Sequence, residues 1–338
     1  MPRGRYAPSP SGWQHLGNAR TALVAWARAR QDGSSFLLRV EDLDGPRTVE
    51  EAVLGNLEEL RWLGLDWDEG PDVGGRFAPY RQSLRVDRYG EALANLEAQG
   101  GTFACYLSRK ELRDVASAPH GATPAYGPRE RAENARIAGQ REREGRVPAV
   151  RLALRDEVVA WRDGIAGEQR VEVARVMGDP VLRRADGVWA YQFAVSVDDV
   201  AMEVAEVVRG GDLLSSTAVQ IVLIERLGGT PPRYLHVPVL LGPDGERLAK
   251  RRGDETLRNL RLAGVPAERV VGLLAWTLGL QAEAAEMAIG TFLDRFDVQR
   301  IPRHPVRLDA DAYAWLRGAA GPPEGAPHVV VDSVERAR

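Results

Sequence analysis

Cysteine is nearly absent from this chain, whose 338 residues include only Cys105. A single cysteine can form no disulfide within the chain and no multi-cysteine metal site, and this usage is typical of the reducing cytoplasm. Long apolar runs are missing as well. The longest nearly apolar stretch, residues 270–280, is shorter than the roughly 18 to 20 residues that span a bilayer, and residues 1–12 have no apolar segment of the signal-peptide type. We therefore expect a cytoplasmic protein that is neither exported nor inserted into a membrane.

Lysine is also rare, since the 45 basic residues include only Lys110 and Lys250. An ammonium is a compact point charge, whereas guanidinium is a planar fork suited to bidentate pairing. A lysine in this chain therefore indicates a position that arginine does not serve, with a surface lysine left by chance as the alternative. The 45 basic and 48 acidic side chains nearly balance, so a nucleic-acid site would be a local patch rather than a basic tail.

The N-terminal residues predict a βαβ unit. Residues 3–7 lead into a turn-forming run at 8–12, the apolar residues of 19–30 recur at helical spacing, and 36–40 form a compact strand that ends in the acidic run 41–44. Such a unit implies a parallel sheet with a right-handed crossover, and ligands outside the carboxyl ends of the strands. The expected fold class is therefore α/β with a Rossmann-type parallel sheet, in which the first loop and the end of the second strand are neighbours.

The chain is long enough for two domains, and we expect it to divide into five parts. We expect residues 1–103 and 179–256 to be the two halves of the Rossmann-type domain, 104–178 an inserted mixed α/β subdomain, 257–318 a short helical region and 319–338 a flexible tail. Helices are expected over 49–63, 83–98, 129–146, 217–227, 270–278 and 283–296. Strands are expected over 150–154, 171–176, 191–197, 203–208 and 237–241.

Two loops have residues suited to phosphate. In the first, 8–18, the N–H groups and dipole of the following helix favour an anion, Gly17 lets a nucleotide approach the backbone, and His15 adds a donor. In the second, 247–253, which follows a turn at 242–245, a glycine-flanked loop can bring Lys250 onto a triphosphate as negative charge builds. The alternatives are a proline-rich connection with an exposed histidine and a solvated cationic loop.

A third group suits an amino acid with two carboxylates. Arg5 and Glu41 end neighbouring strands of the predicted sheet, and Tyr191 and Arg209 are expected where later strands start or end, so all four could line one crevice. Arginine forks bind carboxylates, a carboxylate pairs with an ammonium, and a phenol adds an orienting hydrogen bond. Taken singly, each has an ordinary alternative as a surface ion pair, a core residue or part of a solvated acidic turn.

Several separated motifs together resemble the glutamyl-tRNA synthetase family of class I aminoacyl-tRNA synthetases. The N-terminal motifs are 5–12, 15–17, 19–23, 37–44 and Arg47. Residues Pro8 to Asn18 are similar to the family's HIGH region, with Asn18 in place of the last histidine. Residues Arg247 to Arg251 are similar to its KMSKS region, with Ala249 in place of serine, which removes one hydroxyl contact to phosphate. Segments 181–195, 198–199 and 208–217 resemble one branch, the glutamyl-Q tRNA(Asp) synthetases, which lack the helical anticodon-binding domain.

The resemblance implies an enzyme of the ligase type that activates L-glutamate with ATP and Mg²⁺, without tRNA, to glutamyl-adenylate. The glutamate then passes to queuosine at the first anticodon position of tRNA(Asp), a tRNA modification, and the enzyme is expected to act as a monomer. The implied glutamate site comprises Arg5, Tyr6, Ala7, Pro8, Ser9, Glu41, Tyr191 and Arg209. The implied ATP site comprises Pro8, His15, Gly17, Asn18 and Lys250, of which His15, Gly17 and Lys250 are the catalytic group.

The family often carries a structural zinc held by Cys-x-Cys, a tyrosine and a further cysteine. Here Cys105 stands at the first position and Tyr126 at the third, but Leu107 replaces the second cysteine and none follows Tyr126. A closed zinc site needs four ligands, so we expect no structural zinc. His120 could replace one ligand, whereas Leu107 cannot serve as one.

Two other functions remain open. A truncated glutamyl-tRNA synthetase would charge a tRNA 3′ end and, as in the main branch of the family, would need tRNA to activate glutamate. A non-catalytic paralogue would only bind glutamate or ATP, against which Lys250, His15 and Glu41 argue. A basic cluster at residues 300–307 could meet RNA phosphates or could be a solvated face.

Overall fold

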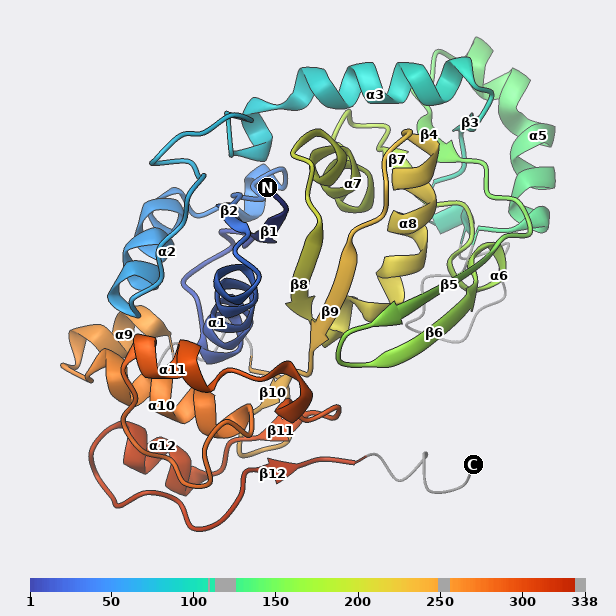
Figure 1. The fold of residues 1–338 in the computed structure, drawn as a ribbon. Helices are drawn as coiled ribbons and strands as arrows, with labels where there is room; N and C mark the ends of the chain where they lie inside the picture. Colours follow the sequence, from blue (N-terminus) through green and yellow to red (C-terminus); the bar gives the residue numbers. More distant parts are fainter. Residues whose placement is uncertain (109, 113–125, 249–255, 332–338) are drawn as a thin grey trace.

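The computed structural model describes residues 1–108, 110–112, 126–248 and 256–331 (Figure 1). Its centre is a sheet with the strand order β2-β1-β8-β9-β5-β6 in the described part of the chain. The strands are β1 (Arg3–Tyr6), β2 (Ser35–Leu38), β5 (Val158–Asp163), β6 (Gly167–Glu172), β8 (Glu206–Gly210) and β9 (Arg233–Val237). All neighbours pair in parallel except β5 and β6, which form an antiparallel hairpin. The predicted α/β fold with a mostly parallel sheet is therefore confirmed.

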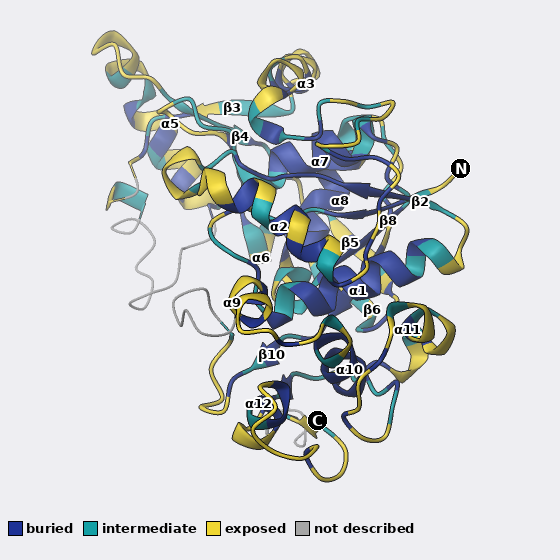
Figure 2. Ribbon diagram, turned by 90° about the vertical axis from the view of Figure 1, so that its left-hand side faces the viewer, coloured by how far each residue is buried: buried dark blue, intermediate teal, exposed yellow. Residues whose placement is uncertain are grey.

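The predicted βαβ unit is confirmed as β1, α1 (Leu16–Gln31) and β2, with Gly4 opposite Phe36 and Arg5 opposite Leu37. Helix α1 lies between the sheet and the C-terminal helices and contacts β1 and β8 on one side and α10 (Ala267–Thr277) and α11 (Ile289–Arg295) on the other. This position explains why α1 is buried along most of its length (Figure 2). It is rich in alanine, which allows close packing on both sides.

The opposite side of the sheet is covered by α7 (Tyr191–Ala201) and α8 (Thr217–Arg226), and α3 (Val86–Ala98) runs across the top of α7 (Figure 1). The expectation of a strand over 191–197 is wrong. The segment contains valines and is buried nearly throughout, and a short buried apolar run has no periodicity that separates a strand from a helix. Tyr191 is consequently the first residue of a helix rather than of a strand.

A smaller antiparallel sheet carries the order β3-β4-β7, formed by β3 (Thr102–Cys105), β4 (Ala149–Leu152) and β7 (Val181–Arg183). It packs near α5 (Pro128–Arg143), while the β5–β6 hairpin of the same region extends the central sheet. The strand expected over 171–176 ends at Glu172, after which α6 (Val173–Met177) begins. The small sheet thus takes strands from both sides of residue 178.

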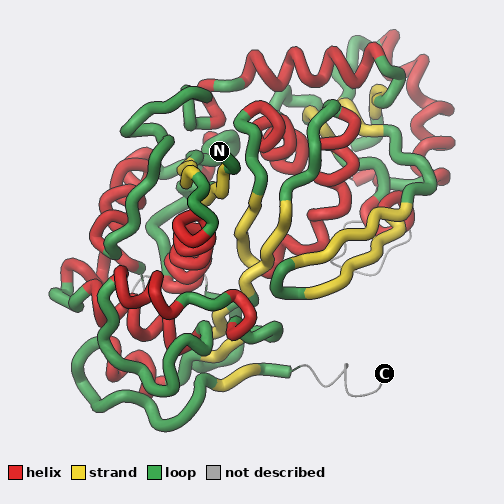
Figure 3. Tube along the Cα trace, in the orientation of Figure 1, coloured by secondary structure: helices red, strands yellow, loops and turns green. Residues whose placement is uncertain are grey.

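Helices dominate the C-terminal region (Figure 3), where α9 (Leu257–Leu262), α10, α11 and α12 (Ala310–Leu316) pack below α1 and α2 (Glu50–Trp62). The expected strand at 237–241 is interrupted, because β9 ends at Val237 and β10 is only Leu240–Leu241. Strand β10 pairs with β11 (Val306–Arg307), which pairs with β12 (His328–Val329). Part of the expected flexible tail is therefore a paired strand, and the helix expected over 283–296 shrinks to α11.

Short 3-10 helices complete the secondary structure at Gly45–Arg47, Gln82–Leu84, Gly211–Ser216 and Val298–Arg300. Among the residues that the structure describes, no helix combines the length and the apolar character needed to cross a membrane.

Candidate functional site

A cavity of about 300 Å³ opens at the carboxyl ends of the central parallel strands. Strand β1 and the loop after it form one wall, the ends of β8 and β9 form another, and the start of α7 lies between them. Every residue expected at the glutamate and ATP sites that the structure describes lines this cavity: Arg5, Tyr6, Ala7, Pro8, Ser9, His15, Gly17, Asn18, Glu41, Tyr191 and Arg209. Lys250 lies outside the described residues.

His15 caps the N-terminus of α1. Its Nδ1 accepts hydrogen bonds from the backbone N–H groups of Gly17 at 3.0 Å and Asn18 at 3.4 Å. A Cβ atom on residue 17 would lie 2.9 Å from the His15 ring, so glycine is required for this contact. The expected anion site is therefore modified, because the imidazole occupies two of the helix N–H groups. Since Nδ1 accepts, a neutral His15 ring carries its proton on Nε2.

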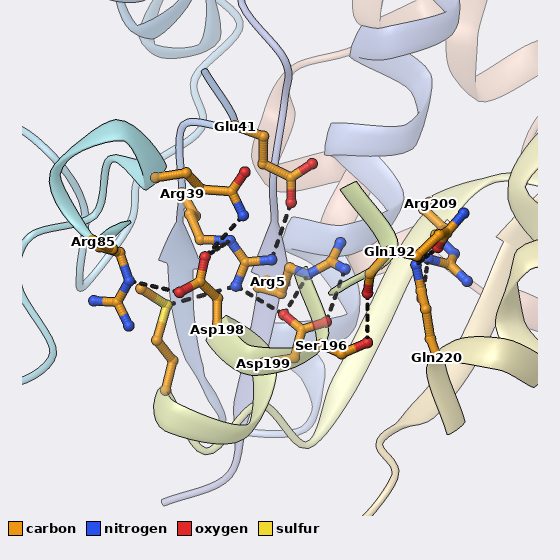
Figure 4. A network of polar contacts seen from close by, with 12 residues as sticks. Arg5, Arg39, Glu41, Arg85, Gln192, Ser196, Asp198, Asp199, Arg209 and Gln220 are labelled. Atoms are coloured by element: carbon orange, nitrogen blue, oxygen red, sulfur yellow. Dashed lines mark hydrogen bonds and ion pairs between the residues drawn. The ribbon is translucent and has the colours of Figure 1, made fainter. Parts of the chain in front are cut away.

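A buried ion network lies beneath the cavity (Figure 4). Arg5 binds Asp199 through two hydrogen bonds of 3.2 and 3.1 Å. Arg39 donates one hydrogen bond of 2.8 Å to the same Asp199 and another of 3.0 Å to Glu41, and so links the two carboxylates. Burial alone would raise the pKa of Asp199, but the two guanidinium groups outweigh it and hold that pKa below its ordinary value. The network fixes Arg5 and Glu41 side by side at the cavity floor.

The charges of the network balance. Arg5, Arg39 and Arg209 contribute three guanidinium groups near the cavity floor, whereas Asp199, Glu41 and Asp163 contribute three carboxylates, the last of them behind the neutral ring of His236. Adding the buried pair of Arg85 and Asp198 leaves this balance unchanged. Arg209 nevertheless bonds no carboxylate directly, so its guanidinium can pair with a carboxylate of a ligand in the cavity.

Arg209 differs from Arg5 and Arg39 because it bonds no carboxylate directly. Its side chain is buried, with the residue 4% exposed, and no carboxylate of the described residues lies within ion-pair distance of it. Neutral groups hold it instead: Nε donates to His236 at 2.9 Å, and its terminal nitrogens donate to Gln220 at 2.6 Å and Thr217 at 2.8 Å. Burial lowers the pKa of Arg209, as expected for a cation that lacks a counter-ion.

Tyr191 lines the same cavity as Arg5 and Arg209 and interacts electrostatically with both. Burial raises the pKa of its phenol to about 12, so the hydroxyl is neutral and can donate a hydrogen bond. Behind it, Gln192 Oε1 accepts from Gln220 at 2.6 Å, and Gln192 Nε2 donates to Ser216 at 2.9 Å. The start of α7 is thereby connected to the residues that hold Arg209.

The chain before residues 249–255 forms the other end of the cavity. Arg247 and Leu248 line it, and Arg247 pairs with Asp212 at 2.6 Å. After that segment, Thr256 forms a bridge with His15, and the N–H of Leu257 donates to Gln14 O at 2.8 Å. The lysine-containing segment is therefore preceded by residues that line the cavity and followed by residues that contact the loop that carries His15.

A second cavity of about 410 Å³ adjoins the first and shares Ser9, Glu41 and Tyr191 with it. Its other walls include the acidic Asp44, the basic Arg47 and Arg184, and the indole of Trp189. Glu41 and Tyr191 thus separate two spaces of similar size, one toward loop 8–18 and one toward Trp189.

The degenerate zinc region is an apolar cluster. Cys105, Leu107, Tyr126 and Ile137 are buried together, and Leu107 occupies the position where the family motif has a cysteine. His120 lies outside the described residues. Within the ranges that the structure does describe, no three His, Cys, Asp or Glu side chains come together as a metal site.

The sequence analysis missed three residues of the site. Asp199 holds Arg5 and Arg39, and Asp163 and His236 form a buried pair behind Arg209, with Oδ2 and Nδ1 2.6 Å apart. One signal for Asp199 was available, because two adjacent acidic residues interrupt an apolar run at 198–199. No local signal indicated Asp163, whose partner lies 73 residues further along the chain.

Comparisons with known proteins agree with this geometry. The family model for class I tRNA synthetases (E and Q), catalytic domain, matches residues 2–300. Glutamyl-Q tRNA(Asp) synthetase of Symbiobacterium thermophilum is 50% identical over 93% of this chain and 98% of its own length, and that of Nitratidesulfovibrio vulgaris is 47% identical over 94% and 98%. A crystal structure of a glutamate tRNA ligase from Elizabethkingia meningosepticum in complex with its amino acid superposes with a TM-score of 0.81 at 27% identity, covering 93% of this chain and 68% of that one. The chain therefore belongs to the class I tRNA synthetases for glutamate and glutamine and is a ligase of the aminoacyl-tRNA synthetase type.

Proposed function

We propose that this enzyme activates L-glutamate with ATP, in the absence of tRNA, and transfers it to queuosine at the first anticodon position of tRNA(Asp). The observation that carries the activation step is the buried Arg209, which lines the cavity and has no directly bonded carboxylate among the described residues. At neutral pH L-glutamate has two carboxylates and one ammonium group, which are complementary in charge to Arg209, Arg5 and Glu41.

The contacts of each side chain support a role for it. Arg209 keeps one N–H on each terminal nitrogen beyond the bonds to Gln220 and Thr217, so it can bind a carboxylate as a fork. Arg5 uses Nε and Nη2 for Asp199, which leaves Nη1 for the second carboxylate. Glu41 accepts from Arg39 through Oε1, and its Oε2 can accept from the substrate ammonium. Tyr191 donates from its neutral phenol.

In the activation step, an oxygen of the glutamate α-carboxylate attacks the α-phosphorus of ATP and pyrophosphate leaves. No side chain acts as a nucleophile, so catalysis comes from positioning and from stabilising the charge that develops. His15, with its proton on Nε2, and Lys250 are the proposed donors to the phosphates. ATP enters as its Mg²⁺ complex; since the described residues offer no acidic metal cage, the ion is expected to arrive on the phosphates.

The acceptor is expected to enter through the second cavity, because that cavity meets the first at Glu41 and Tyr191. Trp189 offers an aromatic face there, on which a base can stack. The relatives support queuosine as the acceptor. The chain is 50% and 47% identical to two glutamyl-Q tRNA(Asp) synthetases and 42% identical to glutamate–tRNA ligase 2 of Acidithiobacillus ferrooxidans.

The acceptor can be tested with two preparations of one tRNA. Labelled glutamate is offered with ATP to tRNA(Asp) that contains queuosine and to the same tRNA with unmodified guanosine at that position. Labelling of the queuosine-containing tRNA alone is expected. Equal labelling of both would identify the 3′ end as the acceptor and favour the alternative of a truncated glutamyl-tRNA synthetase, to which the similarity with glutamate tRNA ligases also points.

A further inference from the structure

Arg209 is held from behind by a buried chain of three side chains. Asp163 Oδ2 lies 2.6 Å from His236 Nδ1, and His236 Nε2 lies 2.9 Å from Arg209 Nε. Asp163 and His236 are each 2% exposed. Asp163 comes from β5 in the hairpin at residues 158–172, whereas His236 and Arg209 lie on the neighbouring strands β9 and β8. These three side chains connect β5 to the cavity.

The Arg209 N–H determines which nitrogen of the His236 imidazole carries the proton. A guanidinium has only donors, so His236 Nε2 must accept from Arg209 Nε–H and cannot carry a proton itself. The proton therefore sits on Nδ1, which donates to Asp163. Thr217 Oγ1, which accepts from Arg209, lies 3.2 Å from the same Nε2 and can donate to it. Burial lowers the pKa of His236 more than Asp163 raises it, which agrees with a neutral ring.

We propose that Asp163 and His236 are positioning residues for substrate glutamate, which select the imidazole tautomer that aims the Arg209 fork at the substrate carboxylate. This inference rests on the proposed function, because it takes glutamate as the ligand of Arg209. The imidazole fixes one side of the guanidinium plane through Nε, while Gln220 and Thr217 fix the terminal nitrogens. A ring of the other tautomer would point an N–H at the Arg209 N–H.

The surroundings of Asp163 allow the tautomer to be inverted by one substitution. Its Oδ1 accepts backbone N–H groups of Ile165 at 3.0 Å, Ala166 at 2.8 Å and His236 at 3.2 Å. In Asp163→Asn the amide oxygen must occupy that position, so the amide NH2 faces His236 Nδ1. The ring then has to accept at Nδ1 and carry its proton on Nε2, where it opposes the donor of Arg209. The same substitution enforces a wrong tautomer in the serine protease triad.

The experiment measures glutamate-dependent ATP–pyrophosphate exchange with the full-length enzyme. Asp163→Asn should raise KM for glutamate roughly ten- to hundredfold, which is the loss of affinity found when a group that orients a metal-ligating histidine is removed. The value of kcat should change less than about threefold, because the lost interaction binds the substrate and the transition state equally. Asp179→Asn is the matched control. Asp179 is also a buried carboxylate that accepts a backbone N–H, from Leu154 at 2.9 Å, and pairs with Arg131 away from the cavity. It should leave KM unchanged.

Repeating the Asp163→Asn substitution in a His236→Gln variant distinguishes control of the His236 tautomer from a merely structural role of Asp163. In His236→Gln the side-chain amide oxygen can accept from Arg209 whatever stands at position 163. The Asp163→Asn substitution should therefore change KM by less than about twofold in that background. An equal rise in both backgrounds, or a wild-type KM in Asp163→Asn itself, would overturn the inference. Absence of exchange in the wild-type enzyme would instead refute the proposed function, before any variant is compared.

Discussion

Glu59 is a buried carboxylate where loop 8–18 meets α9, the helix that follows the lysine-containing segment. It lies on α2 and is 2% exposed; its carboxylate makes no side-chain hydrogen bond among the described residues and faces only the backbone N–H of Gln14, too far for a well-formed bond. Burial raises its pKa from an ordinary value of 4.5 to about 7, although Arg261 and Arg258 of α9 oppose this and Glu58 adds to it. The folded protein therefore holds a proton on Glu59 that the unfolded chain releases at a lower pH.

The sign and size of the effect on stability follow from this difference. Between about pH 4.5 and pH 7 the unfolded chain binds fewer protons than the folded protein, so the free energy of unfolding falls as pH rises. At 1.36 kcal/mol per pH unit, the full loss is roughly 3 kcal/mol. It is absent below about pH 4.5 and complete above about pH 7.

Glu59→Gln removes the titration and keeps the shape of the side chain. Thermal unfolding of wild type and variant should give similar midpoints near pH 4.5, whereas at pH 8 the variant should be more stable by up to about 3 kcal/mol, a shift of several degrees. The control is Glu58→Gln, because the Glu58 side chain is 65% exposed and lies 3.6 Å from Arg261. A difference between wild type and Glu59→Gln that is the same at both pH values, or a less stable variant at pH 8, would refute this reasoning.

Three further predictions concern the site. Lys250→Ala should leave glutamate binding nearly unchanged and slow adenylate formation on the order of 10²–10³-fold, as loss of one transition-state donor does; an unchanged exchange rate would remove the lysine from the mechanism. Arg209→Ala should raise KM for glutamate roughly ten- to hundredfold, because hydrogen bonds to a charged group are lost, and an unchanged KM would misplace the substrate. Dialysed protein should contain no zinc by metal analysis, since Leu107 replaces a ligand, and one equivalent per chain would contradict this.

The start of the fold could be predicted from sequence because its signals are local. The turn at 8–12, the helical spacing after it and the compact strand lie within one short stretch, and the backbone N–H of Glu41 bonds Pro8 O at 3.1 Å in the structure. Topology then places Arg5, Glu41 and Arg209 at the same edge of the sheet. The convergence of these residues thus follows from strand order, which βαβ units largely determine.

Pairing partners could not be predicted in the same way. The bond from Arg5 to Asp199 joins residues 194 positions apart, and the contact of Asp163 with His236 depends on β5 entering the central sheet beside β9. Asp163 would look like an ordinary surface residue in its local sequence, and the acidic pair at 198–199 marks Asp199 as unusual without indicating its partner. The strand expected at 191–197 failed for a related reason, because continuous burial from Phe193 onward removes the alternation that separates a strand from a helix.

The proposed glutamate activation is tested most directly by ATP–pyrophosphate exchange in the absence of any RNA, with L-glutamate as substrate and L-aspartate and L-glutamine as controls. The Arg209 fork, which bonds only neutral groups among the described residues, predicts exchange with glutamate and little with glutamine, which has no side-chain carboxylate. Exchange that appears only after tRNA is added would favour a truncated glutamyl-tRNA synthetase, and exchange under neither condition would contradict the proposal that this cavity activates glutamate.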